Sequence, residues 1–184
     1  DFNVERMIAA AKTSLRVFSQ KFGPYPYGAL RVVEFPRYEL SAEAFPGVVA
    51  LSEGYGFIAR HKGSGVEELA RVIAHEVAHQ WWGMQTIGAG VEGEFFICET
   101  LAQHSALTVL RGEYSDAVLA DYMKTKTELY LRGRARENSA EKPLARTNFE
   151  TSYVHYEKGL VVMNALREVM GERALDAAAE ARRR

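Results

Sequence analysis

The segment Arg71–Gly83, RVIAHEVAHQWWG, constrains this chain more than any other part of the sequence. Its apolar residues predict a helix from about 66 to 82, and His75 and His79, four residues apart, then share one face of that helix. Two such imidazoles can bind one metal ion from the same side, and Glu76 beside them can take a proton from a water at that metal. As ordinary core residues, two buried histidines would need other partners for their ring nitrogens. We therefore expect a zinc site on this helix.

A third zinc ligand is expected from the next helix, because a catalytic zinc commonly has three protein ligands and one open position. The sequence predicts that helix over about 94–110, and Glu99 is the candidate on it. Its neighbour Cys98 could bind zinc as a thiolate, although a small buried cysteine is more often a packing residue. Glu92 and Glu94 are weaker candidates, because they lie in or beside the glycine-rich loop before the helix.

Three further polar residues near these segments are not expected to bind the metal. His61 precedes the metal helix in a loop and is expected at the surface. His104 is expected to pack inside the protein. Gln103 lies one turn after Glu99 and could orient a metal ligand through a hydrogen bond.

Composition narrows the class of protein. Lys plus Arg is 23 and Asp plus Glu is 24 in 184 residues, so charge gives no case for nucleic-acid binding. Cys98 is the single cysteine, which excludes a disulfide within the chain, and no apolar run reaches the length of a transmembrane helix. We expect one domain over residues 1–184, excised from a longer protein, because the chain lacks an initiator Met and ends at Arg182–Arg184 in a helical pattern.

The hydrophobic pattern predicts an α+β fold with a small sheet in the N-terminal part and mostly helices afterwards. We expect residues 1–62 to form a lobe of one helix and the sheet, and residues 63–184 to form a helical lobe. The sheet edge could align a peptide, or the sheet could only support the metal helix. Beyond the two helices above, the predicted elements are a helix over 3–21, strands over 30–35, 48–51 and 54–58, a helix from 115 or 116 to 131, a long polar loop over 133–152, and helices over 155–170 and from 172 onward.

Several motifs together resemble one known family, the gluzincin aminopeptidases, which are aminopeptidase N-like zinc metallopeptidases. The resemblance extends from about Phe22 to the C-terminus. The motifs that carry it are His75-Glu76-x-x-His79-Gln80-Trp81-Trp82-Gly83, Glu99-x-Leu101-Ala102 and Tyr156-Glu157-Lys158-Gly159.

This resemblance implies a thermolysin-like catalytic domain that acts on peptide substrates. It implies that His75, His79 and Glu99 hold zinc and that Glu76 is the general base. It also implies that Tyr156 donates a hydrogen bond to the oxyanion of the tetrahedral intermediate.

The sequence departs from the family at the spacing of the third ligand. The family usually has eighteen residues between the second histidine and the ligand glutamate, whereas nineteen separate His79 from Glu99. A spacing of eighteen would select Cys98. We expect one inserted residue in the glycine-rich loop, because the residues around Glu99 match the family helix better in that register.

A second departure concerns recognition of the substrate's amino terminus. The family carries a Gly-Ala-Met-Glu-Asn motif whose glutamate binds that amine, and Ala44 occupies its position here. Glu43 is one residue away and, on a strand, is expected to face the other side. Glu53 matches a later family glutamate near the substrate amine and is the candidate substrate-binding residue.

The resemblance is strongest to peptidase domains fused to bacterial ABC-type transporter permeases. It implies a membrane-embedded parent protein with this domain on the extracytoplasmic side. The segments that carry this subgroup resemblance are Phe35-Pro36-Arg37-Tyr38, Gly56-Phe57-Ile58-Ala59-Arg60, Leu101-Ala102-Gln103-His104-Ser105-Ala106-Leu107 and Leu131-Arg132-Gly133-Arg134.

The expected function is therefore zinc-dependent peptide hydrolysis of the aminopeptidase type. Because Ala44 removes the usual amine anchor, an endopeptidase or a dipeptide-releasing peptidase is the alternative within enzymes. A non-catalytic zinc module that binds peptides or regulates a transporter is the alternative outside them. Zinc binding alone requires neither Glu76 nor Tyr156, so their presence favours an enzyme.

Overall fold

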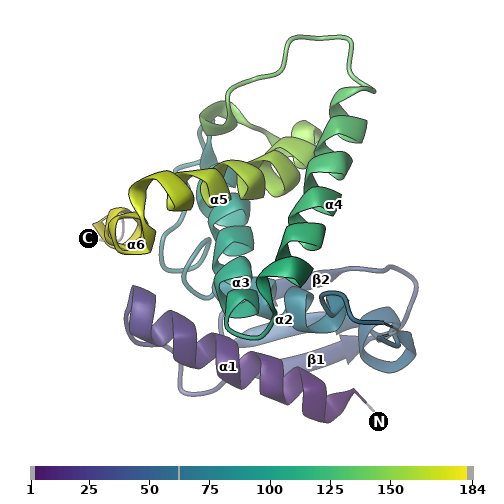
Figure 1. Ribbon diagram of the computed structural model, residues 1–184. Helices are drawn as coiled ribbons and strands as arrows, with labels where there is room; N and C mark the ends of the chain where they lie inside the picture. The colour runs from purple at the N-terminus through teal and green to yellow at the C-terminus, as the bar shows by residue number, and fades with distance from the viewer. Residues whose placement is uncertain (1–2, 62, 182–184) are drawn as a thin grey trace.

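The computed structural model describes residues 3–61 and 63–181 and shows a mostly helical chain with one three-stranded sheet (Figure 1). The expected helical ending at Arg182–Arg184 lies outside the described residues. The regular helices are α1 (Val4–Phe22), α2 (Glu68–Ala78), α3 (Leu101–Arg111), α4 (Asp116–Arg134), α5 (Gly159–Met170) and α6 (Glu172–Ala181). The shorter turns are the π-helical η1 (Gly54–Ile58), η2 (Phe96–Thr100) and η5 (Val154–Lys158) and the 3-10 turns η3 (Leu144–Arg146) and η4 (Phe149–Thr151).

The sheet has the strand order β1-β3-β2. Strand β1 (Arg31–Phe35) runs parallel to the central strand β3 (Val48–Ser52), and β2 (Ala42–Phe45) runs antiparallel to it. Pro46 and Gly47 connect β2 to β3, and Gly47 takes a φ of 73°, which a two-residue turn of this kind requires and glycine adopts without strain. Within the described sheet, β2 is therefore an edge strand with one side free of strand partners.

Two strand predictions differ from the structure. The hydrophobic pattern does not predict strand β2, because its sequence Ala-Glu-Ala-Phe is poor in the β-branched residues that mark strands, and pairing with β3 supplies the stability instead. The prediction of a strand over 54–58 is wrong, because this segment forms the π-helical turn η1. A Cβ at Gly54 would meet the end of the Leu40 side chain, and one at Gly56 would meet the carboxylate of Glu34, so both glycines lie in closely packed surroundings.

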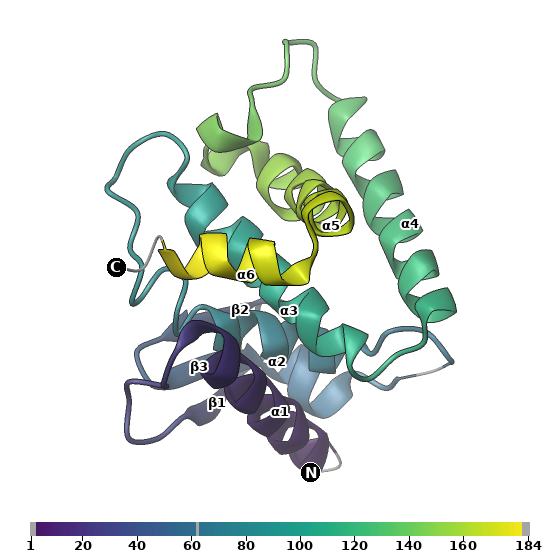
Figure 2. The same cartoon turned by 60° about the vertical axis from the view of Figure 1, so that its left-hand side comes forward.

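Helix α2 lies at the centre of the molecule. It contacts α1 and the sheet on one side and α3 on the other, as the two views together show (Figures 1 and 2). The segment that follows α2 is anchored by an aromatic cluster in which Trp81 packs edge-on against Phe18 and Trp82 packs edge-on against Phe22. All four rings are buried, so the backbone next to His79 is held rigidly.

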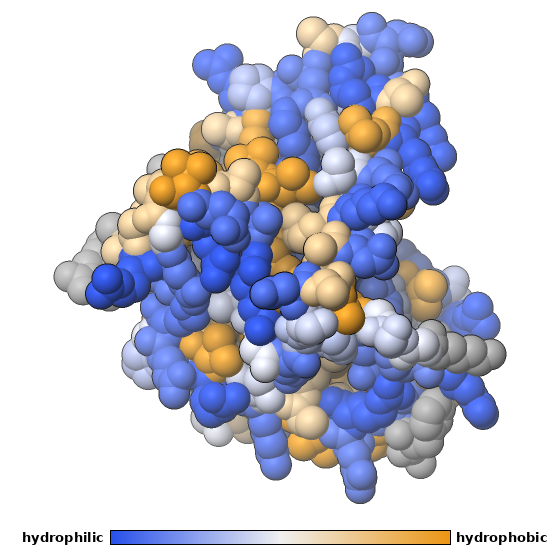
Figure 3. Space-filling model, viewed as in Figure 1, coloured by the Kyte–Doolittle hydropathy of each residue, from blue (hydrophilic) through white to orange (hydrophobic). Residues whose placement is uncertain are grey.

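Helix α4 stands apart from the sheet, and α5 crosses between α4 and α6 (Figure 1). The surface in this view carries hydrophobic side chains along α5, where Leu166, Val169 and Met170 are exposed (Figure 3). Of the helices that the structure describes, none combines the length and the apolar character needed to cross a bilayer.

Candidate active site

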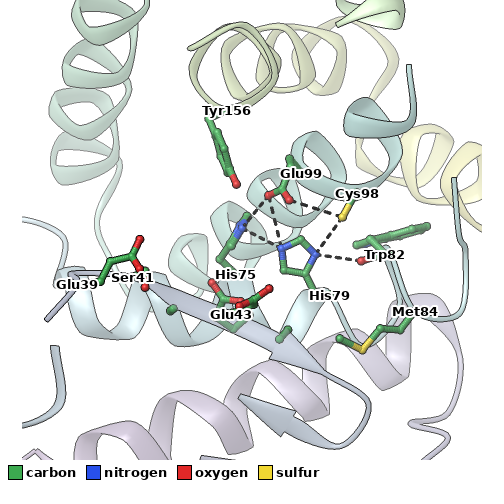
Figure 4. A pocket seen from close by; sticks show the side chains of 14 residues that line it. Glu39, Ser41, Glu43, His75, His79, Trp82, Met84, Cys98, Glu99 and Tyr156 are labelled. Atoms are coloured by element: carbon green, nitrogen blue, oxygen red, sulfur yellow. Dashed lines mark hydrogen bonds and ion pairs between the residues drawn. The ribbon is translucent and has the colours of Figure 1, made fainter. Parts of the chain in front are cut away.

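Two histidines from one helical turn and a glutamate from a later segment of the chain converge beside α2. The Nε2 atoms of His75 and His79 lie 3.1 Å apart, and Oε2 of Glu99 lies 3.3 Å from the first and 3.5 Å from the second (Figure 4). His75 and His79 are one turn apart on α2 and its C-cap, whereas Glu99 comes from η2. Among the described residues, these three form the one group of potential metal-binding side chains.

The spacing of these atoms fits zinc. Zinc bonds nitrogen and oxygen ligands at about 2.0–2.1 Å in a tetrahedron, which separates neighbouring ligand atoms by about 3.3 Å. Oε2 of Glu99 is buried with no hydrogen-bond partner in the described part of the chain. A buried carboxylate oxygen without such a partner, facing two imidazole nitrogens, matches a cation-binding site in both geometry and charge.

The orientation of His79 also suits a metal ligand. Its Nδ1 lies 3.0 Å from the carbonyl oxygen of Trp82, so Nδ1 carries the hydrogen and donates it to that oxygen. Nε2 is thereby left with its lone pair directed toward His75 and Glu99. Gly83, at a φ of 99°, turns the chain directly after this carbonyl.

Cys98 lies on the other side of the His79 ring. Its Sγ is 3.6 Å from Nδ1 of His79, the nitrogen that points away from the cluster, and 3.6 Å from Oε1 of Glu99 (Figure 4). The thiol is therefore near the cluster but does not face the point on which the other three atoms converge. Glu92 and Glu94 likewise do not belong to the group of convergent side chains.

The cluster is buried, and its ionisation reflects both burial and pairing. Burial lowers the pKa of His75 to about 4, which keeps this imidazole neutral as a metal ligand must be. Burial opposes ionisation of Glu99, but the closeness of its carboxylate to His75 and His79 outweighs burial and holds the pKa of Glu99 well below its usual range.

Glu76 and Tyr156 face the same cavity as the cluster. Glu76 follows His75 on α2, and burial raises the pKa of its carboxyl group to about 7. Tyr156 is carried by η5, and its ring points toward His75 and Glu99 (Figure 4), with ring centroids of Tyr156 and His75 5.9 Å apart. Burial, followed by the charge of Glu99, raises the pKa of Tyr156, so its phenol stays protonated and can donate.

The catalytic cavity is the space of about 430 Å³ that these residues line, and β2 forms one rim of it. Glu43 lines the cavity together with Ala44 and Glu39, although exposure alternates along β2, so the expected opposite face does not keep Glu43 out of the cavity. The reason is that β2 is an edge strand whose free side borders the cavity, and residues on both faces reach the rim. Glu53 does not line this cavity; its Oε2 accepts a hydrogen bond from the backbone N–H of Arg37 at 3.3 Å.

Gln80 has a positioning role that sequence reasoning missed. Its side chain is fully buried, accepts a hydrogen bond from the N–H of Gly47 at 2.9 Å and donates to the carbonyl of Phe45 at 3.0 Å. These bonds tie the β2–β3 turn to the end of α2. The sequence does indicate this role, because Gln80 directly follows His79 in a run of otherwise apolar residues and a buried amide must find hydrogen-bond partners.

Comparison with known proteins places most of the chain in one sequence family. The pattern of the peptidase family M1 domain matches residues 7–181. The chain is similar to human endoplasmic reticulum aminopeptidase 2, with 26% identity over 159 residues that make up 80% of this chain and 16% of that protein.

Solved structures resemble the fold. A mutant of an M1 zinc metallopeptidase from Deinococcus radiodurans gives a TM-score of 0.69 at 23% identity, over 95% of this chain and 36% of that one. A mutant M1 zinc metallopeptidase from the same organism bound to a Tyr-Ser-Ala substrate gives 0.64 at 24% identity, over 92% of this chain and 35% of that one. This chain therefore spans only about a third of these structures and a smaller part of the human relative.

Proposed function

Because this chain belongs to peptidase family M1 and is a zinc metallopeptidase domain, we propose that it hydrolyses peptide bonds at the catalytic cavity, with zinc held by His75, His79 and Glu99. The observation that carries this proposal is the convergence of three potential ligand atoms in a cavity that Glu76 and Tyr156 also line. Zinc bound there would polarise the scissile carbonyl and lower the pKa of a coordinated water. The thermolysin-like assignment of the fold belongs to this proposal.

The protein's own groups supply the proton transfers and stabilise the charge. Glu76 takes a proton from the attacking water and delivers it to the leaving amine, and its place in the cavity beside the convergent ligand atoms suits both transfers. Tyr156 donates its hydroxyl hydrogen to the oxyanion that forms on the scissile carbonyl. The arrangement in which Tyr156 and Glu76 enter one cavity from η5 and α2 supports this division of roles.

We propose that the substrate is bound by its free amino terminus. Glu39 and Glu43 on the rim of the cavity are suited to attract an ammonium group, which Ala44 cannot bind. Contact between Glu53 and the amine stays a prediction. If Glu43→Gln raises KM for peptides with a free amino terminus more than for N-acetylated ones, the aminopeptidase assignment holds; efficient cleavage of acetylated peptides by the wild type would favour an endopeptidase.

Metal content tests the ligand set. We expect one zinc per chain by elemental analysis in the wild type, loss of zinc in Glu99→Ala and retention in Cys98→Ala, because only Glu99 reaches the histidine Nε2 atoms. Retention of zinc without Glu99 and its loss without Cys98 would move the third ligand to the thiol.

Hydrolysis by a Glu76 variant separates an enzyme from a zinc-containing binding module. Glu76→Gln is expected to keep zinc, because Glu76 is not among the convergent ligands, and to lose most hydrolysis. A wild type that holds zinc and binds peptides without cleaving them would instead support the module.

The architecture of the longer protein is proposed from motif resemblance alone. On that ground we propose a parent in which this domain is fused to ABC-type transporter permeases and lies on the extracytoplasmic side of a bacterial membrane. Labelling of an introduced exposed cysteine in the parent protein by a membrane-impermeant reagent in intact cells tests the location.

A further inference from the structure

A second cavity opens beside the catalytic one. It has a volume of about 230 Å³ and shares Ala42, His75, Glu76 and Tyr156 with the catalytic cavity, so the two cavities are adjacent. Its remaining wall comes from η1, α2, α3, α4 and η5. In Figure 3 the surface is indented between α4 and the segment that carries η1, which is where two of these walls meet. We call this space the side cavity.

Gln103 on α3 is the unusual residue of the side cavity. Its side chain is only 5% exposed, and its Oε1 is buried without a hydrogen-bond partner among the described residues. No hydrogen bond joins it to Glu99 within the described part of the chain, so the structure gives no contact for the expected role in orienting that ligand. Because a buried amide is costly to leave unpaired, Gln103 is suited to bind a group that enters the cavity.

Apart from Glu76, the charged groups that line the side cavity have ion-pair partners, one of which lies outside the lining. Lys126 lies 3.1 Å from Glu157, and Arg71 forms two hydrogen bonds with Glu68, at 2.5 and 2.8 Å. The wall is therefore polar without an excess of either charge. An incoming carboxylate would meet Glu157 and Glu76, and an incoming cation would meet Lys126 and Arg71.

An uncharged hydrogen-bonding group fits this wall best. A side-chain amide can both donate to and accept from Gln103, whereas an aliphatic side chain would leave its Oε1 unpaired. The same reasoning ranks a hydroxyl group below an amide and above an alkyl group, because a hydroxyl offers fewer donors and acceptors.

The positions of the two cavities indicate which residue of the substrate places its side chain in the side cavity. The acidic rim with Glu39 and Glu43 lines the catalytic cavity and not the side cavity, so the amino-terminal residue lies on the rim side. Glu76, which delivers the proton to the leaving amine, borders the side cavity. We infer that the side cavity binds the side chain of the residue after the scissile bond, and that Gln103 makes it prefer glutamine or asparagine there. This inference rests on the proposed function.

Hydrolysis of matched tripeptides tests the preference. The zinc-loaded wild type is given Ala-X-Ala with X as Gln, Leu, Glu or Lys, and each kcat/KM is divided by that for Ala-Gly-Ala, which places no side chain in the cavity. We expect Gln to exceed Leu by about tenfold, the effect of a buried hydrogen-bonding pair. In Gln103→Leu the ratio of the Gln substrate to the Leu substrate is expected to fall to about one or below. Gln20→Leu makes the same change on the exposed side of α1 and should keep the wild-type ratio.

Two further measurements keep the test decisive. Gln103→Glu, which nearly keeps the shape of the side chain, is expected to shift the preference toward Lys. Calorimetric binding of Ala-Gln-Ala and Ala-Leu-Ala to zinc-loaded Glu76→Gln gives the preference without turnover.

Equal rates for Gln and Leu in the wild type, or a preference that Gln103→Leu and Gln103→Glu both leave unchanged, would mean that the side cavity holds only water. That result would overturn the inference and leave the peptidase function intact. Preferential binding of Ala-Gln-Ala without hydrolysis of any peptide by the wild type would instead overturn the proposed function and keep the side cavity as a side-chain subsite.

Discussion

At the scale of single residues, the two tyrosines of the segment 153–156 have different surroundings. The hydroxyl of Tyr153 donates to Oε2 of Glu137 at 2.8 Å, outside the catalytic cavity. Tyr156 lines that cavity and turns toward His75 and Glu99. The same functional group thus has a structural partner at one position and faces the reaction site at the other.

Replacing Tyr156 by Phe removes only the hydroxyl group. We expect kcat to fall about 100- to 1,000-fold with little change in KM, because the lost hydrogen bond forms with the oxyanion and not with the bound substrate. Steady-state kinetics on a short peptide measures this. Tyr153→Phe is the matched control and should leave kcat within about twofold; an equal loss in both variants would mean that Tyr156 supports the structure and not the reaction.

At the scale of elements, the two π-helical turns η2 and η5 are joined directly. The hydroxyl of Thr100 donates to the carbonyl of His155 at 2.7 Å. Gly159 packs against the same threonine, and a Cβ at this glycine would lie 2.5 Å from Thr100 Oγ1. This contact fixes the position of Tyr156 relative to Glu99, which explains why the fold requires glycine after Tyr156-Glu157-Lys158.

Gly159→Ala is expected to push η5 away from η2. The collision should destabilise the protein by about 1–3 kcal/mol and lower kcat, since Tyr156 moves with η5. Urea denaturation and kinetics measure the two effects. Adding Thr100→Ala should restore part of the stability, and Gly65→Ala, where a Cβ meets nothing within 4 Å, should be close to neutral. A neutral Gly159→Ala would show that the two turns are not held by this contact.

Gln80 joins a helix to a hairpin in the same way. Gln80→Leu leaves the N–H of Gly47 and the carbonyl of Phe45 without their partner, and we expect a loss of about 2–4 kcal/mol in the free energy of unfolding. KM should also rise, because the β2 rim is no longer fixed to α2. Gln20→Leu makes the same replacement at an exposed position and should change stability little. A loss below about 1 kcal/mol would contradict this role.

At the scale of the whole molecule, charges from distant helices gather around one buried histidine. His104 on α3 is 8% exposed, and burial, followed by the positive charges of Arg111, Arg167 and Lys21, lowers its pKa to about 4. Lys21 on α1 also pairs with Glu172 and Asp176 on α6, at 2.6 and 2.5 Å. The prediction that His104 packs inside the protein is confirmed.

His104 should make the protein less stable in acid. Its pKa is about 4 in the folded state and near 6.5 when unfolded, so below about pH 6.5 the unfolded chain binds a proton that the folded chain excludes. Stability is therefore lost as pH falls from about 6.5 toward 4, by about 3 kcal/mol from this residue. In His104→Gln, urea denaturation across this range should show a correspondingly smaller loss. His61→Gln, at the exposed histidine, should follow the wild type; an unchanged pH dependence in His104→Gln would refute the assignment.

Much of the fold could be predicted from the sequence, because the helices carry strong periodic patterns and clear ends. Helix α1 was predicted over 3–21 and runs over Val4–Phe22. The failures lie where tertiary contacts decide the conformation, as in β2, whose residues are weak strand formers, and η1, whose glycines serve close packing. The loop expected over 133–152 contains the last residues of α4 and the short turns η3 and η4, which local patterns do not reveal.

The candidate site was predictable in part for a similar reason. His75, Glu76 and His79 are close in sequence, so their common place on one helix follows from the helical repeat. That Glu99 and not Cys98 joins them depends on how η2 turns, and the roles of Gln80 and Gln103 depend on which elements lie opposite each side chain. Contacts between distant elements cannot be predicted from a single stretch of sequence.

The π-helical turn that carries Glu99 has a consequence for the length of chain that leads to this residue. A π turn takes up one residue more than an α turn, and η2 is the turn through which the chain brings Glu99 to the two histidines. The backbone can therefore reach one point in space along two contour lengths. The position of the carboxylate depends on how the turn winds as well as on the number of residues that leads to it.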